Sequence, residues 1–230
     1  MRLNNLGFKV IQLYRHTKDI ECLKLGIEIL EDSVEKTHKF SPSLPRHLNN
    51  LGFGLYHYYI QTGNTKDWQR VTEAFERAAK IGLEVSVQWS LISARNWINL
   101  AFTHQVWEDI AQAYKYAYQA IDKLLRIQLF LRSYKETWLS EIQGLSAKVA
   151  YALAKVGELE QAALALEQGL AYLLSESLEL NRADLEYLKN QDSSKKLYSN
   201  YWQLQQLQQQ LQQQLTQQTY ANSIKKWELL

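Results

Sequence analysis

The hexapeptide Leu-Asn-Asn-Leu-Gly-Phe occurs twice in this chain of 230 residues, at residues 3–8 and again at residues 48–53. The surrounding pattern still matches at the same shift after the identity has faded, so that HTKDIECL lies opposite QTGNTKDW. A match that extends beyond the identical residues is typical of a duplicated supersecondary unit, and a period between about 20 and 50 residues is characteristic of solenoids. The repeat therefore predicts a fold made of stacked copies of one small unit.

Composition predicts that this unit is helical. The chain has only 2 Pro and 9 Gly, and it is 46% hydrophobic, which is enough for a continuous core. Lys and Arg number 26 against 24 Asp and Glu, and the charges are interspersed, so that inspection singles out no basic face. A net charge of +2 gives no reason to expect nucleic acid or an anionic membrane as partner. We expect a protein or peptide partner instead, because a superhelix of paired helices presents a long concave face that suits an extended peptide or a partner helix.

The boundary between the first two units is marked by SPSLPRH, residues 41–47, which contains both prolines. Proline breaks a helix interior but is tolerated in a first turn, so we expect one unit to end here and a new helix to begin, with Ser43 as its N-cap. Within the second unit, Gly63 and Asn64 are predicted to form the turn between two helices, because both tolerate the left-handed conformation.

The second helix of each unit carries an apolar stripe at spacings of three and four, as in Trp68, Val71, Phe75 and Ala78. The same order of large and small residues recurs within residues 23–34, 107–121 and 159–170. We predict four units, at about 3–40, 46–82, 91–124 and 141–174, followed by a trailing helix, in one repeat domain over residues 1–190. Trp68, Trp107 and Tyr114 fall on these stripes and are predicted to be core residues.

The stripe order, preceded by Leu-Gly in the first helix, resembles the tetratricopeptide repeat (TPR). The fourth unit, AKVAYALAKVGELEQAALALEQG, matches best, with Gly157 at the turn and then Leu159, Ala162, Leu166 and Gly169. The first two units are longer than the usual repeat, with the extra length before the second helix. The resemblance implies an all-α fold, a right-handed α-α superhelix whose first helices line the concave face.

A narrower resemblance covers residues 3–188, most specifically LEQGLAYLLSESLELNRADL. These residues look like the TPR region that lies upstream of CHAT-type, caspase-like protease domains in bacterial proteins. In that family the catalytic histidine and cysteine come later, in a domain that this sequence does not contain. The resemblance implies a regulatory role toward such a protease. The alternative is that the chain is an incomplete fragment of a larger TPR-CHAT protein.

The last 40 residues, 191–230, form a glutamine-rich tail in which Leu204, Leu207, Leu211 and Leu215 are spaced by three, four and four. This spacing predicts an amphipathic, coiled-coil-like helix with a narrow apolar seam. Disorder is the competing interpretation for a tract of such low complexity. An alternative function follows from the helix: a self-assembling structural element that dimerises through the tail.

The candidate partner-binding residues are polar and aromatic side chains predicted on the concave face: Asn4, Phe8, Asn49, Phe53, Tyr56, His57, Arg95, Asn99, Phe102 and Tyr151. The asparagines have two equally weighted interpretations, either contacting a bound peptide or bridging neighbouring helices. Arg95 and Asn99 share one helix face and resemble, in part, the basic and amide positions with which some TPR domains hold a terminal carboxylate. The second unit lacks the corresponding lysine, so a full carboxylate clamp is not expected.

No catalytic, cofactor-binding or metal-binding residue is predicted, since the sequence contains no GxSxG, P-loop, GxGxxG or HExxH motif. Cys22, the only cysteine, lies near His16, but a turn intervenes and residues 23–30 form a core stripe, which predicts a buried structural thiol. A single cysteine, together with no signal peptide and no apolar run long enough for a membrane span, predicts a cytoplasmic protein. The sequence thus indicates a non-catalytic protein-interaction scaffold.

Overall fold

The computed structural model describes residues 2–128, 144–171, 199 and 203. The chain divides into two compact units, Met1–Gly169 and Leu170–Leu230, and the first contains almost all of the described residues. The predicted glutamine-rich tail falls outside the described residues, apart from Ser199 and Gln203. The described part of the chain contains helices and turns but no strand, which confirms the predicted all-α class.

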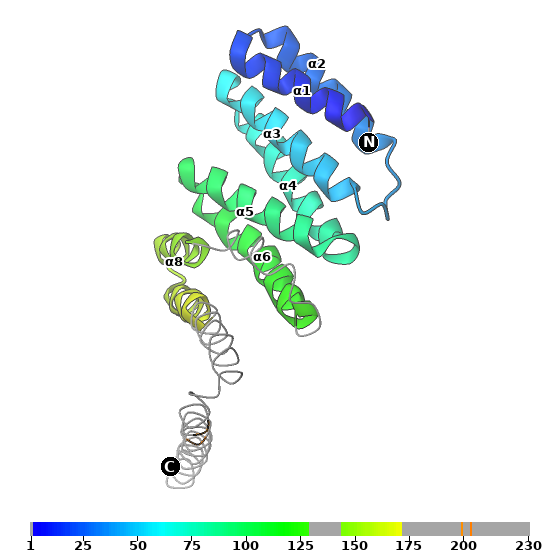
Figure 1. Ribbon diagram of the computed structural model, residues 1–230. Helices are drawn as coiled ribbons and strands as arrows, with labels where there is room; N and C mark the ends of the chain where they lie inside the picture. The colour runs from blue at the N-terminus through cyan, green and yellow to red at the C-terminus, as the bar shows by residue number, and fades with distance from the viewer. Residues whose placement is uncertain (1, 129–143, 172–198, 200–202, 204–230) are drawn as a thin grey trace. The chain divides into compact units, whose positions relative to one another are not determined.

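The helices are arranged in consecutive pairs (Figure 1). They are α1 (Arg2–Thr17), α2 (Ile20–Glu35), α3 (Leu44–Thr62), α4 (Thr65–Val85), α5 (Val87–Thr103), α6 (Trp107–Gln128) and α8 (Leu145–Lys155), and a further helical segment covers residues 159–171. We call α1, α3, α5 and α8 the first helices, and α2, α4, α6 and the segment 159–171 the second helices. Each first helix contacts the next first helix, and α2 and α4 each contact the first helix that follows. This arrangement is compatible with an α-solenoid.

Local side chains set where these helices begin and end. Asp19 caps α2 by accepting the Glu21 N–H at 3.0 Å, and Asn64 caps α4 by accepting the Lys66 N–H at 3.0 Å. Gly63 adopts the predicted left-handed conformation, with φ of 62°, and its N–H donates to the Tyr59 carbonyl. Asn64 instead is extended, because it opens the next helix. Ser43 occupies the N-cap position of α3 without a side-chain capping bond.

The core lies along the predicted stripes. Val71, Phe75 and Ala78 of α4 are fully buried, as are Leu23 and Leu30 of α2. The repeated hexapeptide is explained by this packing. A Cβ atom added at its glycine would lie 2.8 Å from Leu30 Cγ in the first unit, at Gly7, and 2.9 Å from the Phe75 ring in the second, at Gly52. Glycine is required because the second helix of the same unit packs directly against it.

Two predictions about the core are wrong. Trp68, Trp107 and Tyr114 are half-buried instead of buried, because each lies at the margin of its stripe and contacts side chains of the neighbouring unit. Cys22 is also only half-buried, and its thiol donates to Asp19 Oδ2 at 3.4 Å. This hydrogen bond to a carboxylate, with a small contribution from burial, raises the pKa of the thiol, which disfavours the reactive thiolate.

Candidate protein-binding face on the first helices

The first and second helices differ in charge. The four first helices contain no Asp or Glu, whereas α2, α4 and α6 contain twelve acidic residues against eight basic ones. The basic residues of the first helices are Arg2, Lys9, Arg15, Arg46, Arg95, Lys148 and Lys155. The net charge of +2 for the whole chain conceals this difference between first and second helices. Counting acidic residues separately in each predicted helix is the sequence signal that would have found it.

Side-chain amides join the first helices to one another. Asn50 Nδ2 in α3 donates to Asn4 Oδ1 in α1 at 3.1 Å, and Asn96 Nδ2 in α5 donates to Asn49 Oδ1 in α3 at 2.9 Å. Asn4 and Asn49 are only 2% and 4% exposed. Of the two interpretations of the asparagines, the structure therefore favours bridging for these two residues, which leaves them little surface for a partner.

A third link between first helices uses a lysine. Lys148 Nζ in α8 donates to Asn99 Oδ1 in α5 at 2.6 Å, and the same ammonium group lies 5.9 Å from the centre of the Phe102 ring. Arg95, which is half-buried in α5, places its Nη2 atom 3.5 Å from Asn96 Oδ1. The predicted Arg95–Asn99 face is therefore extended by a further cation, on α8, that the sequence prediction did not include.

Two clusters of aromatic rings lie where first and second helices meet. In the first ring cluster, Tyr56, Tyr59, Trp68 and His104 have centroids 5.2–5.6 Å apart, and His104 Nε2 lies 3.2 Å from the Tyr56 hydroxyl oxygen. In the second ring cluster, Phe102, Trp107 and Tyr151 are 5.6–5.8 Å apart. Each combines a tryptophan from the first turn of a second helix with rings from two successive first helices.

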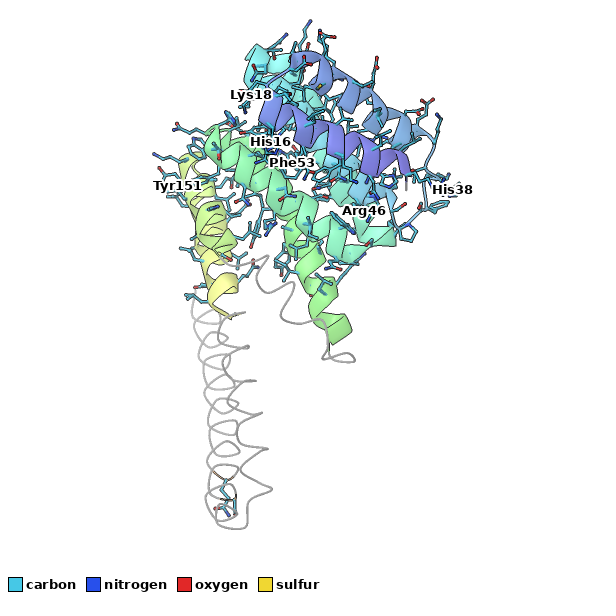
Figure 2. The ribbon with its side chains drawn as sticks, turned by 45° about the horizontal axis from the view of Figure 1, so that its top comes forward. His16, Lys18, His38, Arg46, Phe53 and Tyr151 are labelled. Carbon is cyan, nitrogen blue, oxygen red and sulfur yellow. The ribbon has the colours of Figure 1, made fainter. Side chains whose placement is uncertain are left out.

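The remaining predicted face residues differ in accessibility. Phe8 and Tyr151 are 37% and 49% exposed. The half-buried ones are Phe53, Tyr56, His57, Arg95, Asn99 and Phe102. Phe53 contacts Phe75 of α4 edge-on at 5.5 Å, so part of its ring belongs to the core. Figure 2 labels Phe53 and Tyr151, which come from α3 and α8.

Sequence reasoning did not include six residues of this face, because it considered one helix at a time. They are Tyr59, Trp68, His104, Trp107, Lys148 and Lys155.

The charged groups near this face are cations on and beside the first helices and one carboxylate on α6. Burial, together with the positive charges of Arg15 and Lys18, lowers the pKa of His57, so its imidazole is neutral at pH 7. Lys155 lies 5.3 Å from the Tyr151 ring centre, and Lys18 lies 5.8 Å from that of Tyr14. Asp109, on α6, is held by Trp68 Nε1, which donates to its Oδ2 at 2.8 Å, and burial raises the pKa of this carboxyl group.

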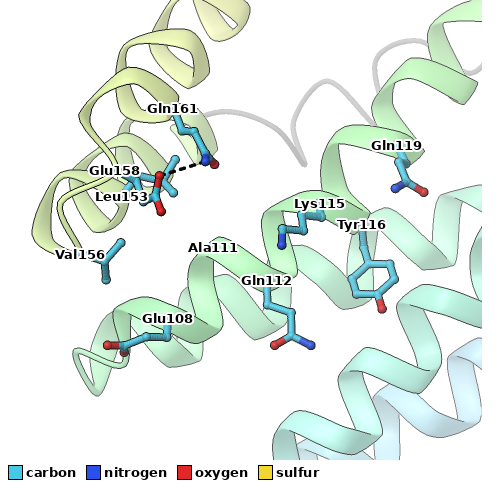
Figure 3. A pocket seen from close by; sticks show the side chains of 10 residues that line it. All are labelled: Glu108, Ala111, Gln112, Lys115, Tyr116, Gln119, Leu153, Val156, Glu158 and Gln161. Atoms are coloured by element: carbon cyan, nitrogen blue, oxygen red, sulfur yellow. Dashed lines mark hydrogen bonds between the residues drawn. The ribbon is translucent and has the colours of Figure 1, made fainter.

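A separate hollow of about 660 Å³ lies between α6 and residues 153–161 (Figure 3). It is lined by Glu108, Ala111, Gln112, Lys115, Tyr116, Gln119, Leu153, Val156, Glu158 and Gln161. The Tyr116 hydroxyl donates to Glu76 at 2.9 Å, and burial and this bond raise its pKa to about 12. Its described lining offers no cysteine, serine or histidine. Nowhere in the described residues do three His, Cys, Asp or Glu side chains gather as a metal site would require.

Comparison with known proteins identifies no family for this chain. No family model matches it, and no curated protein matches it. Among the helices that the structure describes, none combines the length and apolarity needed to cross a membrane. The geometry of the first helices is therefore the basis for a functional proposal.

Proposed function

We propose that this chain is a non-catalytic, TPR-like interaction scaffold that binds an acidic segment of a partner protein on its first helices. One observation supports the proposal above the others: four first helices in succession carry seven basic residues and no acidic ones. A surface of one sign attracts a partner of the opposite sign, which raises the association rate and excludes partners of like charge.

The aromatic clusters define the rest of the partner's chemistry. Lys148 and Lys155 each lie within 6 Å of a ring, of Phe102 and Tyr151 respectively. A carboxylate bound there would meet an ammonium group, and an adjacent apolar side chain would meet the ring. Aromatic and arginine side chains dominate the binding energy of many interfaces. The partner segment we expect therefore alternates acidic with apolar or aromatic residues.

The TPR resemblance adds an architecture to this proposal. In the right-handed superhelix that it implies, first helices line the concave face, so the basic side chains and rings would converge on a segment lying along that face. The CHAT resemblance adds a candidate partner, a caspase-like protease or a protein that controls one.

The proposal is tested with two fluorescein-labelled peptides of equal length and aromatic content, one rich in Glu and one in which Lys replaces each Glu. We expect the acidic peptide to bind more tightly by about tenfold or more, measured by fluorescence anisotropy. Changing Arg95 and Lys148 together to Glu should remove this preference. The matched control changes Arg77 and Lys80, two exposed basic residues of the second helix α4, together to Glu, which alters the net charge by the same amount and should leave the affinity unchanged.

Two results would contradict the proposal. Equal affinity for the two peptides would remove the charge argument. An equal loss in the Arg77/Lys80 variant and in the Arg95/Lys148 variant would show that net charge, and not the first helices, governs binding. Binding should also weaken as salt rises from about 50 to about 500 mM, because exposed charges are screened.

A further inference from the structure

α1 and α2 present an exposed apolar surface at the end of the helix row. Leu6 and Leu13 of α1 are 51% and 50% exposed, and Leu25 of α2 is 50% exposed. Half-buried apolar side chains adjoin them on the same helix sides. We call this surface the end face; it consists of Leu3, Leu6, Val10 and Leu13 of α1 with Cys22, Leu25 and Ile29 of α2. Such a contiguous apolar surface is typical of an interaction site.

The internal repeat shows what covers the equivalent of the apolar stripe of α1, which consists of Leu3, Leu6, Val10 and Leu13. Its equivalents in α3, 45 residues later, include Leu48, Leu51 and Leu55, which are 0%, 7% and 4% exposed. They are covered by the preceding helix pair: Val34 of α2 packs against the cluster that contains Leu48. The same four-residue stripe in α1 is uncovered among the described residues. Its composition is therefore that of a surface that lies under another helix pair.

Charged residues border the end face in a complementary way. On α1, Arg2 and Lys9 lie four residues before and three residues after Leu6. On α2, Glu21 and Glu28 lie at the same two spacings from Leu25. One edge of the end face therefore carries the basic pair, since residues at these spacings share one helix side, and the other carries Glu28 together with Glu21, which is paired with Lys24 at 2.8 Å. α1 as a whole has no acidic residue, and α2 has five against one lysine.

This pattern fits a second copy of the same chain. A two-fold axis parallel to the helices lays α1 of one copy antiparallel on α2 of the other. Apolar stripe then meets apolar stripe, and each basic edge meets an acidic edge. An axis perpendicular to the helices would instead lay α1 on α1 and bring Lys9 toward its own equivalent. We propose that two copies of this chain form a homodimer through the end face, with α1 of each copy packed on α2 of the other.

The dimer uses Arg2 and Lys9, two of the seven basic residues of the first helices, and it differs from dimerisation through the glutamine-rich tail. The end face lies on the far side of α1 from α3. A dimer contact there therefore leaves the row of basic residues on α3, α5 and α8 uncovered. Two such rows in one assembly would bind a partner with two acidic segments more tightly than one row could.

The test uses the full chain and its mass in solution by light scattering after size exclusion. At a concentration of about 100 µM we expect a mass twice the 26.9 kDa of one chain. Leu13→Asp should give the monomer mass. Its matched control is Leu164→Asp, a leucine of similar exposure, 53%, on the segment 159–171, which should remain dimeric. Unchanged helical circular dichroism verifies that both variants fold.

A charge exchange tests the arrangement of the helices. Lys9→Glu alone and Glu28→Lys alone should each weaken the dimer, and the two changes in one chain should restore it, because opposite charges again meet. A monomeric wild-type chain, or a dimer that persists in Leu13→Asp, would overturn the proposal. Failure of the double exchange to restore the dimer would overturn the packing of α1 on α2.

Discussion

The first and second helices are joined to their neighbours by different chemistry. Between first helices the links include buried amides, Asn4 with Asn50 and Asn49 with Asn96. Between α2 and α4 the link is an exposed ion pair, Arg70 Nη2 to Glu31 Oε1 at 3.0 Å. Buried amides satisfy one another without a counter-charge. The first helices are thus linked without any carboxylate, whereas carboxylates of Glu31, Glu76 and Asp109 link the second helices to one another.

The largest effect is expected from the core that lies between the first and second helices. Phe75, on α4, is fully buried and contacts Phe53 and Gly52 of α3. Phe75→Ala should lower the free energy of unfolding by about 3–5 kcal/mol, because it removes the ring and leaves a cavity. Urea unfolding measures this change. Phe40→Ala, at a side chain that is 65% exposed, is the control and should change stability little.

A smaller effect is expected from the buried amide links that distinguish the first helices. Asn49→Ala should cost about 1–3 kcal/mol, because the amide of Asn96 loses its acceptor. Gln12→Ala is the control, since Gln12 carries an exposed amide on the first helix α1. Equal losses of stability in the two variants would contradict a structural role for the link.

The pH dependence of stability sharpens the comparison at the junction of α2 and α3. His47 is 1% exposed, with Nδ1 at 3.2 Å from Ser33 Oγ and 3.0 Å from Thr37 Oγ1, and burial chiefly lowers its pKa. The folded state therefore binds this proton less tightly than the unfolded state, whose histidine pKa is near 6.5. Its contribution to stability is complete above pH about 6.5 and is lost as the pH falls through the folded-state pKa.

Urea unfolding at a series of pH values between about 7.5 and 5 measures this loss. His47→Gln should make the stability curve flatter than that of the wild type. The control is His16→Gln, at an exposed histidine, and its curve should follow the wild type. Parallel curves for wild type and His47→Gln would show that His47 does not carry the effect.

The smallest effect is expected from the exposed ion pair of the second helices. Arg70 and Glu31 are 45% and 47% exposed, so Glu31→Gln should lower stability by less than about 1 kcal/mol. The difference should shrink further at high salt, because the pair is screened by solvent and ions. A loss of stability as large as that of Asn49→Ala would contradict the proposed difference between the links of the first helices and those of the second helices.

The sequence by itself determined the helical class, the pairing of helices and most of the core. Low Gly and Pro content, the stripes of α4 and α2 and the repeated hexapeptide predicted these features, because they depend on local propensity and on the period of one helix. Gly63 was predicted to end α3 for the same local reason. The four unit boundaries and the glutamine-rich tail stay predictions.

Only the tertiary structure decided which side chains meet across units. Periodicity places Asn49 or Trp68 at an angle around its own helix, but it does not say that Asn96 or His104 lies against it. Those contacts join residues 36 to 47 positions apart, and they depend on how closely whole helices approach. The basic face has the same origin. Its charges are spread along the sequence, and they come to lie on neighbouring helices only because the first helices pack side by side.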